Sequence, residues 1–208
     1  MSPINRPERK KSAAKTAAIL DGAMQEFLSN GYAATSMDRV AAAAGVSKAT
    51  VYSHFQDKAS LFAALMQQLA ADKFHATSFD FHAKNTATGD PKDVLSQLAQ
   101  ELLADAYCNP QACEFMRLMV GESGRFPELA EPYITNVAKP IIDGLSRYLD
   151  THPELALSDP EATARLFLGT LVYFIMLQRV LHGADMMPME NDRLIKTLVD
   201  LITSSAKS

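Results

Sequence analysis

The polar side chains between Ser47 and Lys58 are the residues whose types and spacing suggest a chemical role, which is contact with a nucleic acid. Lys48 is long enough to reach a base, most naturally the O6 and N7 atoms of guanine, and Ala49 could meet a thymine methyl group. Donors for phosphate oxygens lie within a turn or two. The donors that we expect to serve DNA in this way are Ser47, Thr50, Tyr52, His54 and Lys58.

Two short helices are needed to hold these side chains. Thr35 is a suitable N-cap for a helix that runs to about Ala44, with the carboxylate of Asp38 in its first turn. Gly45 ends that helix, and Ser47 can cap a second helix over KATVYSHF. Such a pair is the unit whose second helix enters the major groove of DNA. The alternative is a solvated polar face on an ordinary helical hairpin.

Charge is distributed unevenly along the 208 residues. The net charge of −4 taken alone argues against a polyanionic partner. Residues 1–60 nevertheless contain eight Lys and Arg against five Asp and Glu, a net charge of +3, whereas residues 61–208 carry −7. The basic part therefore coincides with the proposed DNA-contacting side chains. A hydrophobic fraction of 48% is typical of a soluble globular protein.

Residues 18–63 resemble the DNA-binding domain of the TetR family of bacterial transcriptional regulators. The resemblance rests on the ordered blocks FLSNGY, AAAAGVSKATVYSHF and a DK pair before an apolar helix. It implies that Lys48 and Ala49 face bases. The residues for which it implies phosphate contacts are Thr35, Thr50, Tyr52, His54 and Lys58. Ser53 departs from the pattern, because many family members carry an aromatic residue there.

The N-terminal part is predicted to consist of an arm and a helical domain. Residues 1–12 contain four basic residues and two prolines without periodic apolar positions, so we expect a flexible basic arm. Such an arm is either a solubilising tail or a segment that follows DNA. Residues 13–60 form the predicted helix-turn-helix domain, whose first helix, 13–30, ends at Gly31. Residues 61–208 form the predicted ligand-binding and dimerisation domain.

The C-terminal part predicts further helices and no credible strand, which gives an all-α fold of nine or ten helices. The predicted helix starts are Asp57 or Ser60, Pro91, Pro110, Pro127 or Pro132, Pro160, and Asn191 or Asp192. We expect Pro140 to lie inside one helix and bend it. The most apolar run, residues 166–177, is shorter than the roughly twenty residues of a membrane span. We therefore expect a buried helix and no membrane contact.

No pattern of a catalytic or metal site appears in this part of the sequence. It contains no nucleophile elbow, phosphate loop or cluster of carboxylates, so we expect neither an enzyme nor a cofactor. His75 and His82 lack partners at metal-ligand spacing, which disfavours a metal site. Cys108 and Cys113 are expected to be inert thiols, in keeping with a cytoplasmic location.

Dimerisation and ligand sensing are the two purposes that we assign to the C-terminal part. Helices near 160–182 and 191–204 are too apolar all round for a surface position, so we expect them to pair in a homodimer. Ten methionines could form flexible ligand-contacting walls, although methionine is usually core filler. The segment MRLMVGESGRFPELAEPY resembles the AefR-like branch of the family. The candidate pocket residues are Met66, Met116, Met119, Tyr133, Tyr173 and Gln178.

These features predict a ligand-responsive regulator of transcription. We expect a repressor that binds a palindromic operator in double-stranded DNA as a homodimer and leaves it when a small hydrophobic or aromatic effector binds. The effector would shift the helix over residues 60–75 and so change the separation of the two Lys48-bearing helices. One alternative is an all-α enzyme or carrier with a merely structural N-terminal hairpin. Another is a DNA-binding regulator without a small effector.

Overall fold

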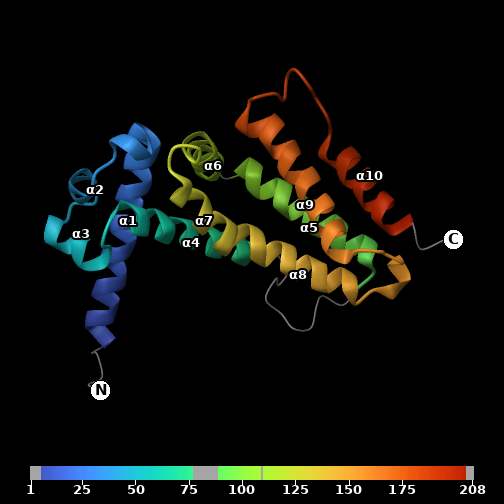
Figure 1. Ribbon diagram of the computed structural model, residues 1–208, viewed down its shortest axis with the longest axis horizontal. Coiled ribbons are helices and arrows are strands. Elements are labelled where there is room, and N and C mark those ends of the chain that lie inside the picture. Colours follow the sequence, from blue (N-terminus) through green and yellow to red (C-terminus); the bar gives the residue numbers. More distant parts are fainter. Residues whose placement is uncertain (1–5, 77–88, 109, 205–208) are drawn as a thin grey trace. The chain divides into compact units, whose positions relative to one another are not determined.

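The computed structural model describes residues 6–76, 89–108 and 110–204. All regular structure within these ranges is helical, which confirms the predicted all-α fold. The elements, labelled in Figure 1, are α1 (Arg6–Ala34), α2 (Met37–Ala43), α3 (Lys48–His54), α4 (Lys58–Ala76), α5 (Pro91–Cys108), α6 (Pro110–Glu122), η1 (Pro127–Leu129), α7 (Ala130–Tyr133), η2 (Ile134–Ala138), α8 (Lys139–Asp150), η3 (Pro153–Leu155), α9 (Pro160–Ile175), η4 (Met176–Val180) and α10 (Asn191–Thr203).

The helices form two compact units. The first consists of Met1–Gln68 and Arg117–Tyr133, and the second of Leu69–Met116 and Ile134–Ser208. The chain therefore passes from one unit to the other within α4, within α6 and after α7. The domain boundary predicted at residues 60 and 61 remains a prediction, and below we describe each unit separately.

Helix α1 begins earlier than predicted. Residues 6–12, expected to belong to a flexible arm, are already helical. Pro7 lies in the first turn, where a missing N–H costs nothing, and no proline or glycine follows it before Gly22. Residues 1–5 of the predicted arm lie outside the described residues. Gly31 interrupts the helix with a φ of 75°, close to the predicted end, and a short helical turn continues to Ala34.

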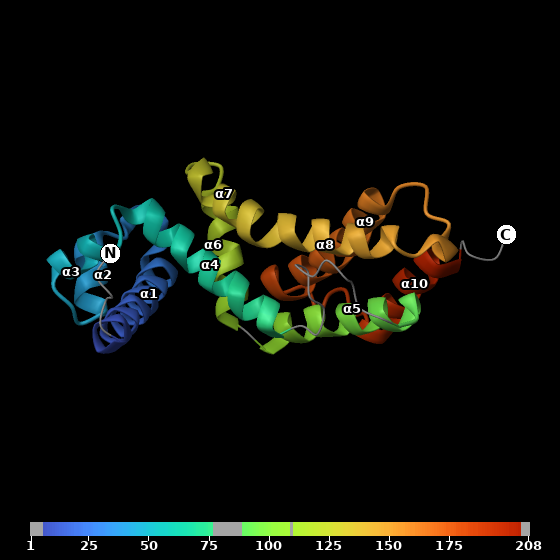
Figure 2. The ribbon, with the colours of Figure 1, turned by 90° about the horizontal axis from the view of Figure 1, so that it is seen from below.

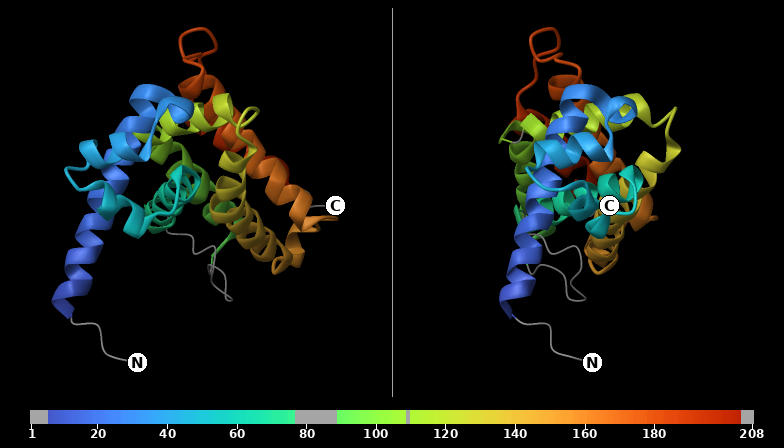
Figure 3. Two further views of the ribbon diagram at one scale, coloured as in Figure 1. Left: turned by 60° about the vertical axis from the view of Figure 1, so that its left-hand side comes forward. Right: turned by 90° about the vertical axis from the view of Figure 1, so that its left-hand side faces the viewer.

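The core of the first unit contains a cluster of aromatic rings. Phe27 is stacked on Tyr32 with 5.6 Å between ring centroids, and Phe62 meets Phe27 edge-on at 5.5 Å. Helix α1 also approaches α2 very closely, as Figure 3 shows from two sides. A Cβ atom on Gly22 would lie only 2.8 Å from the backbone nitrogen of Ala44, so the crossing requires glycine at this position.

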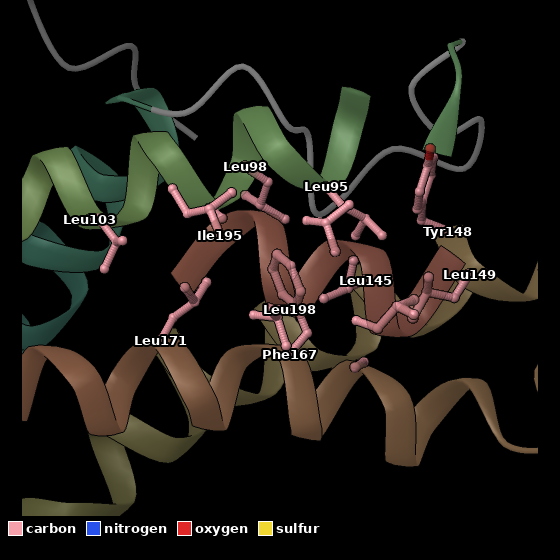
Figure 4. Close-up of a cluster of buried hydrophobic side chains, with 14 of the residues drawn as sticks. Leu95, Leu98, Leu103, Leu145, Tyr148, Leu149, Phe167, Leu171, Ile195 and Leu198 are labelled. Atoms are coloured by element: carbon pink, nitrogen blue, oxygen red, sulfur yellow. The ribbon is translucent and has the colours of Figure 1, made fainter. Parts of the chain in front are cut away.

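The second unit is built on aliphatic packing. Helix α8 packs along α9, and α5 packs against both α9 and α10 (Figure 2). Buried side chains from all four helices meet in one cluster (Figure 4). The labelled members are Leu95, Leu98, Leu103, Leu145, Tyr148, Leu149, Phe167, Leu171, Ile195 and Leu198. Each of the four helices contributes one apolar face to this cluster, which is therefore their shared hydrophobic core.

The predicted long helix with Pro140 inside it is observed as a continuous helical run from α7 through η2 to α8, but it contains a π-helical segment that was not predicted. Residues 134–138 form the π-helical segment η2, and Pro140 lies in the first turn of α8. Proline has no N–H for a helical hydrogen bond, and its ring clashes with the preceding turn. The widened turn of η2, immediately before α8, accommodates the proline within the continuous helical run.

Helix α9 continues through the π-helical segment η4 and is buried on one face only. Phe167, Leu171 and Phe174 enter the core, whereas Leu166 is 68% exposed and Tyr173 66%. The expected buried helix is thus buried on one face in the single chain, and the predicted pairing of its other face in a homodimer stays a prediction. The 21 residues Pro160–Val180, with a mean hydropathy of 1.2, are long and apolar enough to cross a membrane by length and composition alone. The core helix of a globular protein can be equally long and apolar, and α9 has the buried face that such a core helix needs.

Candidate nucleic-acid interface

Two caps and a tight turn fix the position of α3. Ser47 is its N-cap, as predicted, and the Ser47 hydroxyl accepts a hydrogen bond from the Thr50 amide at 3.1 Å. Before it, Gly45 has a φ of 65° and donates to the Ala42 carbonyl at 3.2 Å, while Val46 donates to the Ala41 carbonyl at 3.0 Å. This pair of bonds is the Schellman motif that ends many helices at a glycine. Local signals therefore determine both ends of the turn.

Thr35 does not cap α2. The N-cap is Ser36, whose hydroxyl accepts from the Arg39 amide at 3.3 Å. Thr35 is buried, and its hydroxyl lies 2.8 Å from the Gly31 carbonyl and 3.1 Å from the Glu26 carbonyl, to which it donates. The Gly31 carbonyl lies where α1 is interrupted, and the Glu26 carbonyl lies in the turn before it. The Thr35 side chain thus connects α1 to α2 instead of facing outward.

Helix α3 presents its predicted base-reading residues to solvent. Lys48 and Ala49 are exposed, and Tyr52 is 54% exposed. Thr50 and His54 are half-buried, and an imidazole nitrogen of His54 lies 3.0 Å from the Thr16 hydroxyl on α1. The exposed side chains therefore project from a helix that is tied to α1 at its C-terminal end.

Cations of the first unit are engaged by oxygen atoms of the same unit. Arg39 on α2 forms an ion pair of 3.0 Å with Glu26 on α1. Lys48, at the start of α3, forms an ion pair with Asp38 in the first turn of α2. The ammonium of Lys48, the cation at the start of α3, therefore already lies beside the carboxylate of Asp38.

The ammonium of Lys58 contacts backbone and ring atoms of the first unit. Its ammonium donates to the carbonyl oxygens of Tyr32 at 2.5 Å and Ala33 at 3.3 Å, and it lies 4.2 Å from the centre of the Tyr32 ring. Partial burial lowers the pKa of Lys58, against the opposing influence of Glu122 and Glu128. In this conformation Lys58 caps the end of α1, and its predicted phosphate contact stays a prediction.

A segment from the middle of the chain completes the first unit. Phe126, in the turn between α6 and η1, meets the Tyr32 ring edge-on with 5.0 Å between centroids. Burial raises the pKa of the Tyr32 hydroxyl to about 12, aided by Glu128 and Asp57. Tyr32 is thus surrounded by aromatic rings and one ammonium, so its position fixes the junction of α1, α4 and this turn.

The candidate pocket residues occupy different environments. Met66, Met119 and Tyr133 belong to the first unit, and Met116, Tyr173 and Gln178 to the second. Met66 and Met119 are buried, and burial raises the pKa of Tyr133. Gln178 is buried and donates to the Met187 carbonyl at 2.7 Å, which ties the end of α9 to the following loop. The exposed ring of Tyr173, in contrast, lies on the outer face of α9.

Sequence reasoning missed three contacts that shape this interface. Gly22 sets the approach of α1 to α2, Asp38 pairs with Lys48, and Phe126 covers Tyr32. Only Asp38 had a usable signal, since a carboxylate in the first turn of α2 lies across the turn from the start of α3. Among the described residues no group of His, Cys, Asp and Glu could hold a metal ion. His82 lies outside the described residues.

Two family descriptions match the chain. "Bacterial regulatory proteins, tetR family" matches residues 19–65, and "AefR-like transcriptional repressor, C-terminal domain" matches residues 93–204. The first match covers α2, α3 and most of α1, where the exposed side chains lie. The second covers more than half of the chain.

Curated relatives match over a shorter length. The HTH-type transcriptional regulator AcrR of Shigella flexneri is 34% identical over 85 residues, which are 41% of this chain and 38% of that protein. The HTH-type transcriptional regulator TtgR of Pseudomonas putida is 32% identical over 99 residues, 47% of each chain. The match therefore spans less than half the length of these relatives.

Solved structures match over nearly the whole chain. The "Flavonoid-responsive Regulator FrrA" has a TM-score of 0.73 and 28% identity, and the alignment covers 92% of this chain and 96% of that one. The "SmeT-Triclosan complex" has a TM-score of 0.69 and 21% identity, with 92% and 91% covered. The second likeness concerns the fold alone.

Proposed function

The chain belongs to the TetR family of bacterial transcriptional regulators, and from this membership we propose that it represses transcription as a homodimer on a palindromic operator until a small hydrophobic or aromatic molecule releases it. Membership makes the protein a DNA-binding regulator and not an enzyme. The operator, the dimer and the effector are the proposal. A bacterial regulator meets its DNA in the cytoplasm, which we propose as its location.

The observation that carries the proposal is the exposed surface of α3. Lys48, Ala49 and Tyr52 project from a short helix whose start is capped and whose end is tied to α1. An exposed helix held on two sides can enter a major groove without losing its support. Lys48 then contacts guanine O6 and N7, and Ala49 contacts a thymine methyl group.

Phosphate contacts are assigned to the donors that flank these residues. We assign them to Ser47, Thr50, Tyr52 and His54, whose polar atoms lie on or beside α3. Lys58 joins them only if its ammonium leaves the carbonyls of α1. The buried hydroxyl of Thr35 already has acceptors within the protein, so we leave it out of the contact set.

Dimerisation is supported by the outward faces of α9 and α10. Leu166, Val172 and Tyr173 are exposed on α9, and Leu201 is exposed on α10. A second copy related by a two-fold axis would cover these side chains with their own counterparts. The resulting dimer would hold two α3 helices for two half-sites about one turn of DNA apart.

An aromatic effector is supported by one relative. FrrA, whose name describes it as flavonoid-responsive, aligns with this chain over nearly its whole length. Buried Met66 and Met119 are soft side chains that could adapt to such a molecule, and Met116 is half-buried. Tyr133 and Gln178 could supply polar contacts. The exposure of Tyr173 favours a place in the dimer interface over a place in the pocket.

Binding of the full-length protein to DNA across a salt series tests the proposal. The probes are a duplex from upstream of its own coding sequence and a duplex selected by the protein from a random pool. We expect Lys48→Ala to weaken specific binding by about tenfold or more and to relax the preference for guanine. Tyr52→Phe should weaken binding uniformly across sequences, because it removes one phosphate donor.

Lys139→Ala is the matched control, since Lys139 forms an exposed ion pair of 2.8 Å with Asp143 on α8 in the other unit. Failure to select any sequence from the pool, or equal effects of the two lysine variants, would contradict the proposal. The effector is tested by release of the selected duplex by a panel of flavonoids and other aromatic compounds. If none releases it, the protein is a regulator without a small effector.

A further inference from the structure

The ion pair between Lys48 and Asp38 carries an inference about sequence specificity. Asp38 lies in the first turn of α2, and Lys48 is the first residue of α3, so the pair bridges the turn of the helix-turn-helix. Both side chains face solvent, with exposures of 65% for Lys48 and 52% for Asp38. The neighbouring Arg39 pairs with Glu26 on α1, so it does not compete for Asp38.

A carboxylate in the first turn of α2 favours the start of that helix, but this role does not require an ion pair with Lys48. An ion pair between two exposed side chains contributes little to stability, because water screens it and both side chains lose freedom. A carboxylate on the face that meets DNA also repels phosphates and neutralises the cation that would attract them. Base recognition does account for the ion pair, since it benefits from a cation with a fixed direction.

We propose that Asp38 is a specificity-determining residue that holds the ammonium of Lys48 toward base edges and away from phosphates. An ammonium has three N–H donors. When one is used by Asp38, two remain for the O6 and N7 atoms of guanine. A phosphate could take the ammonium only by drawing it from Asp38 or by approaching a carboxylate. The inference rests on the proposed contact of Lys48 with DNA.

Pre-orientation has a further consequence for a lysine. Its four-carbon stem is flexible, and a free ammonium can reach many phosphate positions on non-specific DNA. An ammonium already held by Asp38 loses less freedom when it meets guanine, so the specific complex is favoured. Asp38 thereby converts a general attraction into a sequence-dependent one.

The test compares Asp38→Asn, Lys48→Ala and the double variant with the wild-type full-length protein on two duplexes. One duplex is selected by the wild-type protein from a random pool, and the other has the same composition in scrambled order. For Asp38→Asn we expect the ratio of non-specific to specific Kd to fall about tenfold. On the scrambled duplex the slope of log K against log salt should become steeper by about 1, for one additional phosphate contact. In the Lys48→Ala background Asp38→Asn should change neither quantity.

Two further variants separate orientation from charge. Asp21→Asn removes another exposed carboxylate, on α1, and should leave the ratio unchanged. Asp38→Glu keeps a carboxylate within reach of Lys48 and should keep the ratio near the wild-type value. Thermal unfolding shows whether each variant is folded. If Asp38→Asn is unfolded, Asp38→Glu and the two variants that contain Lys48→Ala carry the test.

Three results would overturn the inference: equal tightening of both duplexes by Asp38→Asn, the same effect in the Lys48→Ala background, or an equal effect of Asp21→Asn. A wild-type protein without any sequence preference would overturn the proposed function and the inference together. A specific wild-type protein whose ratio is unaffected by Asp38→Asn would overturn the inference alone.

Discussion

Each of the two compact units has an apolar core, but they differ in the further contacts that stabilise them. In the first, single polar atoms have defined partners, such as the Thr35 hydroxyl on the carbonyls of α1 and the Lys58 ammonium above the Tyr32 ring. In the second, leucine, isoleucine and phenylalanine side chains of four helices fill one cluster. Hydrogen bonds depend on direction, whereas aliphatic packing depends mainly on volume.

This difference suits the two proposed tasks. A unit that presents Lys48 and Tyr52 to DNA must fix where side chains point. A unit that pairs with a second copy needs instead a filled core behind an apolar outer face, and α9 provides both. Substitutions in the first unit should therefore disturb geometry, and substitutions in the second should disturb packing or association.

The largest expected effect is loss of volume in the second unit. Phe167 is fully buried in the cluster, so Phe167→Ala should lower the free energy of unfolding by roughly 3–5 kcal/mol. Urea unfolding followed by circular dichroism measures this. Gln100→Ala, on the exposed face of α5, is the control and should change stability by less than about 0.5 kcal/mol. Equal effects of the two variants would show that the cluster does not carry the stability of this unit.

Association is expected to be nearly as sensitive as packing. Leu166→Glu would place two carboxylates near the two-fold axis of the proposed dimer and weaken self-association by about 3 kcal/mol or more. Sedimentation velocity distinguishes dimer from monomer. The monomer should remain folded, because Leu166 is exposed in the single chain. Gln100→Glu adds the same charge on α5, and a dimer that survives Leu166→Glu would place the interface elsewhere.

In the first unit a single methyl group should be harmful at a close helix crossing. Gly22→Ala would bring a Cβ atom to 2.8 Å from the Ala44 nitrogen. We expect a loss of about 1–3 kcal/mol in stability and weaker operator binding, since α2 must shift. Gly121→Ala on α6 is the matched control, because no atom lies within 4 Å of the added Cβ. It should stabilise the protein by about 0.5–1 kcal/mol, because alanine favours a helix interior. Equal effects of both variants would contradict the steric argument.

The smallest expected effect compares one buried tyrosine from each unit. Burial is the main cause that raises the pKa of both Tyr32 and Tyr148 to about 12, from 10.0. Because the folded pKa is raised, each contribution to stability is complete below pH 10 and is lost as the pH rises toward 12. Between pH 9 and 11 each tyrosine should cost about 1.4 kcal/mol of unfolding free energy.

Urea unfolding at both pH values measures this cost. Tyr32→Phe and Tyr148→Phe should each reduce the loss of stability between pH 9 and 11 by about 1.4 kcal/mol. A variant that leaves the dependence unchanged would show that its tyrosine ionises normally in the folded protein.

Local signals in the sequence predicted the helix-turn-helix well. The helix expected over KATVYSHF is observed as Lys48–His54, because the Ser47 cap and the Gly45 turn act within a few residues. The start of α9 was predicted for the same reason, since Asp159 caps it by accepting from the Ala162 amide at 2.9 Å. Caps and turns that are set by residues close together in the chain can therefore be predicted from the sequence.

Features that depend on distant residues could not be predicted in this way. The need for glycine at position 22 arises from a contact with Ala44, and the ammonium of Lys58 turns to carbonyls of residues 32 and 33. Pro140 was expected to bend a helix, but a π-helical segment absorbs the conflict one turn earlier. Sequence patterns suggest that a constraint exists, whereas packing decides how it is satisfied.

The contact between Phe126 and Tyr32 has a consequence for how the protein is made. The first unit includes Arg117–Tyr133, so the N-terminal helices leave the ribosome well before the ring that covers Tyr32 has been synthesised. Until then, a nascent chain that has reached α4 exposes part of its aromatic core. The ring cluster around Tyr32 is therefore complete only after translation has passed residue 126, when residues 69–116 of the second unit have also been made.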